Sequence, residues 1–294
     1  MSDDVRVGLV GVNTSHAGAF ARILNENKAI PGARLSWVWG GELRPDQPDA
    51  STLAEKYGID AVAGEPTELL GQTDLVLVVD DTGGGATHAP MARPFVDAGI
   101  ATFVDKPMTL ELGEAHALFA LAATKNAPLF SASALRFSAE LEADREKFAA
   151  LGDLSSVVSV GPGEWFYYGV HAVEQLFTVA GGDVEWVQRF SFPDRDVAVL
   201  SYANGGPTAT VQTLRDAAYA FHVTAYGKEG FHAAQVKDST AYYTNLVRAA
   251  VEMARTRVAP IAAEETLNLL AVLQAGVLSA ERGGERVTVA ELVR

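Results

Sequence analysis

The stretch of residues 8–20, GLVGVNTSHAGAF, follows a short apolar run and has the form of a strand that turns sharply into a helix. A dinucleotide fingerprint, G-x-G-x-x-G, that begins at Gly11 would have glycine again at positions 13 and 16. This chain has Asn13 and His16 there. Gly11 lies where the chain must turn, and asparagine tolerates left-handed backbone better than most residues do. The loop therefore keeps part of a dinucleotide-binding pattern.

The two residues after Asn13 favour a helix that begins here. Thr14 and Ser15 are common helix caps, and free N–H groups at a helix N-terminus attract phosphate even where the glycines are missing. A capped turn that binds no ligand explains the same residues. The motif alone leaves both interpretations open.

The first half of the chain alternates between β-rich runs and helical periodicity. Alternation of this kind predicts a parallel sheet with helices on both faces, because parallel strands need crossover connections. Ligands of such sheets bind at the carboxyl ends of the strands. The predicted strands are residues 5–11, 33–40, 74–80 and 100–107, and the predicted helices are residues 17–28, 51–58, 88–99 and 110–126.

After about Pro128 the pattern changes to strands in succession, which indicates an antiparallel sheet. The sequence therefore predicts an α/β protein with an N-terminal doubly wound Rossmann domain, residues 1–123. A C-terminal α/β domain with an open, mainly antiparallel sheet follows at residues 124–294, and its last helices can pack back on the first domain. The predicted elements are helices at 138–152 and 169–180, strands at 155–160, 184–192, 195–203, 208–215 and 220–227, and a helical tail from 244.

Composition limits the possible partners. The net charge of −14 argues against binding to nucleic acid, because that affinity comes from clustered lysine and arginine. The absence of cysteine excludes disulfides and thiolate chemistry. The apolar runs are too short for a bilayer, and the N-terminus lacks the features of a signal peptide. We therefore expect no membrane partner and a cytoplasmic location.

Two further strand ends carry charged residues. In WGGELRPD, residues 39–46, Glu42 suits the ribose hydroxyls of NAD and Arg44 suits the phosphate of NADP, so that either cofactor is possible. In FVDKPMTL, residues 103–110, Asp105 and Lys106 precede a proline that holds the lysine backbone extended. A lysine at this edge of the sheet can orient a substrate and influence nearby acids and bases.

Several motifs together resemble the Gfo/Idh/MocA family of NAD(P)-dependent oxidoreductases. They are the D-K-P strand end, SALRF at 133–137, GVHAVEQLFTVAGG at 169–182 and the tail at 265–289. The opening loop is similar to a minor variant of that family, G-x-(D/N)-T-S-H. The resemblance implies a cofactor site that includes Gly11, Asn13, Thr14, Ser15, His16, Glu42, Arg44, His88, Asp105 and Lys106.

The resemblance also implies a substrate site. Lys106 corresponds to the active-site lysine of the family, with Asp105 in place of the usual glutamate, and His171 corresponds to a histidine that acts near the substrate hydroxyl. Tyr167 stands where many members have aspartate, and Glu174 replaces another common aspartate. Catalytic roles are expected for Lys106, His171 and Tyr167, and substrate contacts for Lys106, Arg136, Tyr167, His171 and Glu174.

The implied activity is hydride transfer between NAD or NADP and a hydroxyl or ketone of a sugar, cyclitol or related polyol. Two alternatives stay open: a lyase or hydrolase that retains its cofactor and oxidises the sugar transiently, and a non-catalytic binding or assembly protein. No third metal ligand accompanies His171 and Glu174 at a recognisable spacing, so we expect no catalytic metal. The family's open sheet implies a homo-oligomer, a dimer or tetramer.

Overall fold

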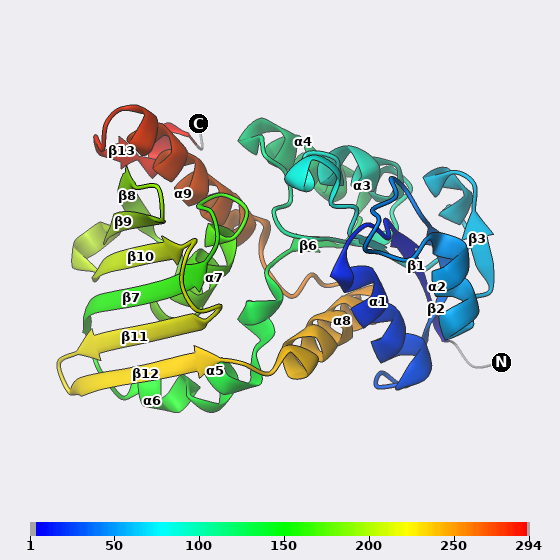
Figure 1. The fold of residues 1–294 in the computed structure, drawn as a ribbon, viewed down its shortest axis with the longest axis horizontal. Coiled ribbons are helices and arrows are strands. Elements are labelled where there is room, and N and C mark those ends of the chain that lie inside the picture. The colour runs from blue at the N-terminus through cyan, green and yellow to red at the C-terminus, as the bar shows by residue number, and fades with distance from the viewer. Residues whose placement is uncertain (1–3, 293–294) are drawn as a thin grey trace. The chain divides into compact units, whose positions relative to one another are not determined.

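The computed structural model describes residues 4–292, and the chain divides into two compact units (Figure 1). The first unit comprises Met1–Ala132 and Tyr243–Ala263, and the second comprises Ser133–Tyr242 and Glu264–Arg294. The first unit extends beyond residue 123 because strand β6, Leu129–Ser131, pairs with the parallel sheet. One late helix, α8, spans Ser239–Thr256, and most of it lies in the first unit.

The first unit contains a parallel sheet in the order β3-β2-β1-β4-β5-β6, which is the doubly wound Rossmann order. Strands β1, β4 and β5 are rich in Val, Leu and Phe and are buried at nearly every position, as expected when helices cover both faces. The strands are β1 Val5–Val10, β2 Ala33–Trp39, β3 Ala61–Ala63, β4 Leu75–Val78, β5 Ala101–Val104 and β6 Leu129–Ser131.

Helices lie on both sides of this sheet in Figure 1, with α3 and α4 on one side and α1 and α8 on the other. Helix α1 continues without a break into a π-helical turn, Arg22–Glu26. Helix α2 begins after Asp49, whose carboxylate accepts from the Thr52 N–H, and not at Ser51; left-handed Gly58 ends it as predicted. The helices are α1 Ser15–Ala21, α2 Ala50–Tyr57, α3 His88–Asp97 and α4 Leu112–Lys125.

The second unit is built on a sheet in the order β12-β11-β7-β10-β9-β8-β13. Only β7 and β10 pair in parallel, and the other neighbours are antiparallel, so the prediction of an open, mainly antiparallel sheet is confirmed. The strands are β7 Leu154–Pro162, β8 Val184–Ser191, β9 Arg195–Tyr202, β10 Thr208–Leu214, β11 Phe221–Gly227, β12 Gly230–Val236 and β13 Val287–Thr288.

Helix α7, Gly169–Ala180, packs against the middle strands of this sheet and is buried along most of its length. Buried Trp165 donates from Nε1 to the Leu273 carbonyl, 2.8 Å away, and lies against Gly276, where any side chain would collide with the indole. Trp165 is therefore a core residue. The other helices are α5 Ala139–Ala143, α6 Arg145–Ala149 and α9 Ala263–Glu281.

Four strands, β3, β6, β12 and β13, are absent from the sequence prediction. Strands β3 and β6 have three residues each, too few to show a period. Strand β12 carries small and polar residues, GFHAAQV, and is held by the hairpin that it forms with β11. Strand β13 has two residues and lies in the tail that the sequence predicts as helical. Pairing with neighbouring strands, β8 in the case of β13, defines all four.

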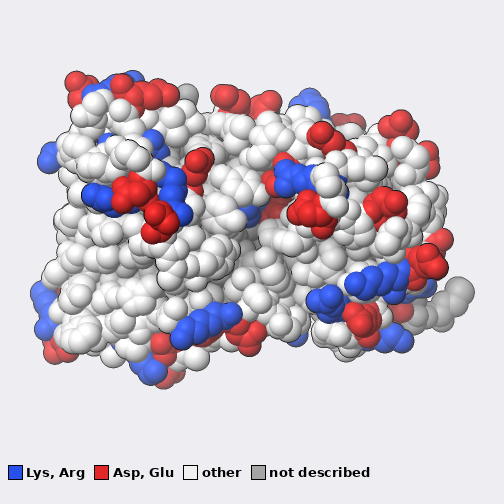
Figure 2. Space-filling model, viewed as in Figure 1, with Lys and Arg blue, Asp and Glu red and all other residues white. Residues whose placement is uncertain are grey.

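No helix within residues 4–292 is long and apolar enough to cross a membrane. On the face drawn in Figure 2, Lys and Arg are interspersed with Asp and Glu, and no broad field of positive charge appears there.

Candidate functional site

Gly11 makes the turn at the carboxyl end of β1. Its φ is +101°, and a Cβ atom there would collide with the backbone of Asp80, just beyond β4. A side chain at this position would be strained both by the left-handed backbone and by the collision. Glycine is therefore required here by the close approach of two loops at the edge of the sheet.

Asn13 joins the same two loops through its side chain. Oδ1 accepts from the Asp81 N–H at 2.8 Å, and Nδ2 donates to the Thr82 hydroxyl at 3.0 Å. Asn13 is not among the residues with positive φ, so the reason for asparagine lies in these hydrogen bonds and not in a left-handed backbone. Asn13 thus ties the turn after β1 to the loop after β4.

Thr14 and Ser15 begin α1 as the sequence predicts. Thr14 is the N-cap, with its hydroxyl accepting from the His16 N–H, and Ser15 is the first helical residue. The His16 ring is packed beside Phe20, centroids 5.8 Å apart, and Tyr243 of α8, centroids 5.0 Å apart. His16 is therefore held in place by aromatic neighbours within the first unit.

Asp105 and Lys106 follow β5 and are both buried, at 5% and 6% exposure. Oδ2 of Asp105 is hydrogen-bonded to Nδ1 of His16, and Oδ1 accepts from the Lys106 backbone N–H at 2.8 Å. Burial raises the pKa of Asp105, but His16, Lys106 and His88 together hold it well below its usual range. Burial lowers the pKa of Lys106, and the carboxylates of Asp105 and Asp81 oppose this lowering only in part.

His88 is the first residue of α3 and is buried. Its Nδ1 lies 2.7 Å from the carbonyl oxygen of Pro107, so Nδ1 is the donor, because a carbonyl only accepts. Its Nε2 is buried without a hydrogen-bond partner among the residues that the structure describes. His88 therefore supports the turn after Lys106 and keeps one ring nitrogen available to a ligand.

The turn after β2 carries the two residues predicted to select the cofactor. Glu42 is exposed. Arg44 binds Asp81 twice, with Nη1 3.0 Å from the carboxylate and Nη2 donating to the backbone carbonyl at 3.1 Å. Arg44 is thus connected to the loop after β4, and through Asp81 to the charges around Lys106.

His171 lies in the first turn of α7, in the second unit. The Ser133 hydroxyl lies 2.6 Å from Nδ1 of His171. Glu174, one turn further along α7, accepts from the Ser133 backbone N–H at 3.1 Å, and its other oxygen accepts from Arg136 at 3.0 Å. The residue that orients the imidazole is therefore Ser133, and Glu174 acts one step further away.

Arg136 also contacts Glu265 of α9, so it is paired with two acids. Burial raises the pKa of Glu174, whose side chain is 4% exposed, and the Arg136 charge opposes this rise in part. The ion pair is consequently important for keeping Glu174 as a carboxylate.

Aromatic rings surround His171 within the second unit. Its ring centroid lies 5.7 Å from that of Tyr168 and 5.4 Å from that of Phe221. Tyr167 meets Tyr168 edge-on at 5.4 Å, and exposed Tyr219 meets Phe221 at 5.3 Å. The imidazole is thus fixed from the sides as well as through Nδ1.

The structure adds four residues that the sequence analysis did not single out. Asp80, Asp81 and Thr82 follow β4, where the run VVDDT already shows acids at the carboxyl end of a strand. Ser133 lies inside the quoted motif SALRF, but nothing in the sequence connects it to His171, 38 positions later.

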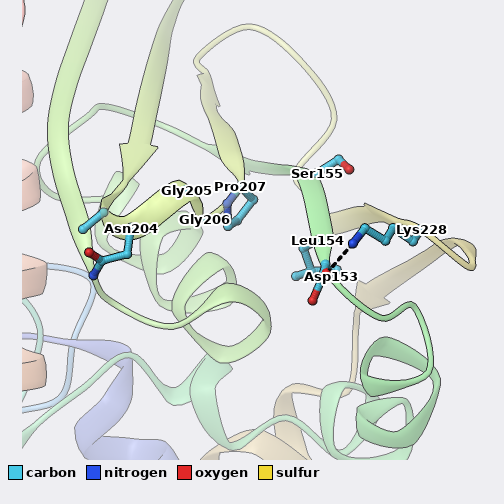
Figure 3. Close-up of a pocket in the computed structure, with 9 residues that line it drawn as sticks. Asp153, Leu154, Ser155, Asn204, Gly205, Gly206, Pro207 and Lys228 are labelled. Carbon is cyan, nitrogen blue, oxygen red and sulfur yellow. Dashed lines mark hydrogen bonds and ion pairs between the residues drawn. The ribbon is translucent and has the colours of Figure 1, made fainter.

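The structure describes no group of three or more His, Cys, Asp or Glu residues able to hold a metal ion within residues 4–292. A hollow of about 600 Å³ lies on the second unit beside β7 and the β9–β10 turn (Figure 3). It is lined partly by Ser155, Asn204 and the ion pair of Lys228 with Asp153, and it contains none of the predicted site residues.

The first unit has the strand order and the loop positions of an NAD-binding Rossmann domain. Residues 5–133 match the family model of the Gfo/Idh/MocA proteins, described as an oxidoreductase family with an NAD-binding Rossmann fold. The resemblance to the Gfo/Idh/MocA family that the motifs indicate is therefore confirmed for residues 5–133.

Individual proteins resemble the chain more distantly. An uncharacterized oxidoreductase of Escherichia coli (strain K12), YdgJ, is 32% identical over 126 residues, which are 42% of this chain but only 32% of YdgJ. GenD2 from gentamicin A biosynthesis, solved with NAD, has a TM-score of 0.83 at 20% identity. The match covers 98% of this chain and 97% of the GenD2 chain. The myo-inositol dehydrogenase of Lactobacillus casei, solved with NAD(H) and myo-inositol, has a TM-score of 0.81 at 17% identity. The match covers 97% of this chain and 96% of the dehydrogenase chain. At these identities the two structures establish a shared fold.

Proposed function

We propose that this protein is an NAD(P)-dependent oxidoreductase that transfers a hydride between nicotinamide and a hydroxyl or ketone of a sugar, cyclitol or related polyol. The observation that carries the proposal is that Lys106 is buried at the carboxyl end of β5. Its backbone N–H donates to Asp105, which is in turn hydrogen-bonded to His16. A buried lysine in this position is costly unless it is used or paired.

The proposed role of Lys106 is to bind the reacting hydroxyl and to stabilise the negative charge that develops on its oxygen. Its burial increases the strength of such an interaction, because the charge acts through a medium of low dielectric constant. Its lowered pKa also makes the proton easier to exchange near neutral pH than on an exposed lysine.

His171 is proposed to take the proton of the substrate hydroxyl at Nε2. The Ser133 hydroxyl at Nδ1 and the rings of Tyr168 and Phe221 fix the orientation of the imidazole. Histidine suits this role because its usual pKa is close to neutrality. Tyr167 assists as a hydrogen-bond donor, whereas Arg136 and Glu174 support the site indirectly by holding Ser133.

The residues around the first turn fit a nicotinamide dinucleotide. Gly11 places no side chain at the edge of the sheet, and the buried Nε2 of His88 has no hydrogen-bond partner among the described residues. The proposed cofactor site consists of Gly11, Asn13, Thr14, Ser15, His16, Glu42, Arg44, His88, Asp105 and Lys106. When bound, the nicotinamide ring supplies the carbon that accepts or gives the hydride.

The proposed assembly is a homo-oligomer formed through the sheet of the second unit. Several large apolar side chains are exposed on its hairpins, among them Phe190 at 43%, Tyr226 at 46% and Phe231 at 70%. Rings in such positions are common in interfaces between copies of a chain. Sedimentation equilibrium of the parent and of Phe231→Ser tests this: a monomer in both contradicts it.

The central test is calorimetric titration of the folded protein, freed of bound nucleotide, with NAD, NADH, NADP and NADPH. We expect one nucleotide to bind saturably and a polyol screen to reveal substrate-dependent reduction of it. If no nucleotide binds to the folded protein, hydride transfer is wrong and a binding or assembly role replaces it. If NAD stays tightly bound while a substrate is converted without release of NADH, the reaction is redox-neutral.

A further inference from the structure

His16 occupies the position of the third fingerprint glycine, yet its side chain makes a specific contact. Only 14% of that side chain is exposed, and Nδ1 is hydrogen-bonded to Asp105, 89 positions later in the chain. A glycine there would let the helix pack closely on the strand but could make no such contact. The replacement therefore adds a link between the first turn of α1 and the end of β5.

The direction of this hydrogen bond is determined by Asp105. The lowered pKa of Asp105 makes it a carboxylate, and a carboxylate oxygen only accepts. Nδ1 of His16 must then carry the proton, whether the ring is neutral or charged. With Oδ1 bound to the Lys106 backbone N–H and Oδ2 bound to His16, the carboxylate of Asp105 is held at both ends.

We propose that His16 is a positioning residue for Lys106, acting through Asp105. By holding Oδ2, the His16 ring fixes the rotation of the carboxylate, and the carboxylate in turn fixes the backbone N–H of Lys106 and the charge beside its amine. The inference rests on the proposed function, since Lys106 needs a fixed position only if it meets the reacting group.

Loss of His16 has a definite electrostatic consequence. Oδ2 of Asp105 would be left buried without its donor, and the Lys106 ammonium would be its principal remaining cationic neighbour. The ammonium form of Lys106 would be favoured more strongly, so that Lys106 would titrate at higher pH. The charged or titratable groups that act here are His16 of α1, Arg44 after β2, Asp81 after β4, His88 of α3 and Asp105 after β5.

Two uncharged variants distinguish the effect of the hydrogen bond to Asp105 from the effect of side-chain size at position 16. In His16→Asn the amide nitrogen takes the place of Nδ1, whereas in His16→Gln it takes the place of Nε2. We expect His16→Asn to lose less in kcat than His16→Gln and His16→Ala, because only asparagine keeps a donor for Oδ2 of Asp105. His16→Gln and His16→Ala should lose about tenfold or more in kcat, because misplacement of a reacting group affects the turnover step. A change in the KM for the nucleotide that comes from loss of the imidazole should be common to all three variants.

A second measurement needs no turnover. The 13Cε signal of Lys106, assigned by its absence in Lys106→Arg, is followed by NMR in the nucleotide-free protein from about pH 6 to pH 11, which spans the ordinary range of histidine and lysine. We expect the midpoint to move upward in His16→Ala and to stay in place in His16→Asn. The matched control is His232→Ala, which removes another histidine–aspartate pair, with Asp144, from the second unit.

The outcomes are distinguishable. An unmoved Lys106 midpoint in His16→Ala, or equal kcat in His16→Asn and His16→Gln, overturns the positioning role even if the protein is an active oxidoreductase. If no polyol is turned over but the midpoint moves as expected, the coupling from His16 to Lys106 holds and the proposed function fails by itself.

Discussion

Replacement of Arg136 by methionine tests the ion pair between Arg136 and Glu174, which is connected to His171 through Ser133. The Arg136 side chain is 20% exposed and its Nη1 lies 3.0 Å from Oε2 of Glu174, which is 4% exposed. Removal of one partner from a buried ion pair costs about 3–5 kcal/mol, because an uncompensated charge is left behind. Methionine keeps the apolar volume of the arginine stem, so the loss is mainly electrostatic.

The loss in the free energy of unfolding has an upper limit, because Glu174 can take up a proton and so remove the uncompensated charge. Keeping a glutamate protonated in the fold costs about 1.4 kcal/mol for each pH unit above its unfolded pKa of about 4.3. The limit is about 3.7 kcal/mol at pH 7 and about 1 kcal/mol at pH 5. Arg136→Met should therefore lose about 3 kcal/mol at pH 7 and at most about 1 kcal/mol at pH 5. The loss of stability grows with pH because the pKa of Glu174 in the folded variant is raised above its value in the unfolded chain.

Urea unfolding at pH 5, 6 and 7 measures this difference. Replacing Trp37 and Trp39 by phenylalanine leaves Trp165 and Trp186, which are both in the second unit, as the fluorescent reporters. Adding Glu174→Gln to Arg136→Met should restore most of the stability at pH 7, since glutamine still offers an acceptor to Ser133.

The control for general loss of an ion pair is Arg145→Met, whose partner Glu142 is exposed. It should change stability by less than about 0.5 kcal/mol at either pH. A loss from Arg136→Met that is the same at pH 5 and pH 7, or a double variant as unstable as the single one, would refute the reasoning.

Three further outcomes are expected. Gly11→Ala should destabilise the protein and abolish nucleotide binding, because Gly11 has a positive φ and a Cβ atom there would collide with Asp80. Gly18 has open space around it inside α1, so Gly18→Ala should stabilise the protein by about 0.5–1 kcal/mol. Melting curves measure the stabilities, and calorimetric titration measures nucleotide binding. Lys106→Ala should abolish turnover and leave nucleotide affinity largely intact, and normal turnover would remove Lys106 from the mechanism. His171→Ala should flatten the near-neutral limb of the pH–rate profile, and a surviving limb would reject its proton-transfer role.

Local patterns were sufficient to predict most of the architecture. Buried parallel strands such as Leu75–Val78 read as continuous apolar runs, and helices such as Leu112–Lys125 show their own period and end signals. The same patterns place Gly11 and Lys106 at strand ends, because the end of an apolar run is visible in one dimension. Short or polar strands such as Gly230–Val236 could not be predicted this way, since their stability comes from pairing with a neighbour.

The sequence by itself determined the class of fold, the residue types at the edge of the parallel sheet and, through several motifs together, the resemblance to the Gfo/Idh/MocA proteins. The partners of those residues were decided by the tertiary structure. Asn13 meets the loop after β4, His16 meets Asp105, and Ser133 rather than Glu174 meets His171. These contacts join positions 38 to 89 residues apart, and hydrogen bonds depend on distance and direction in space, which no spacing along a chain specifies.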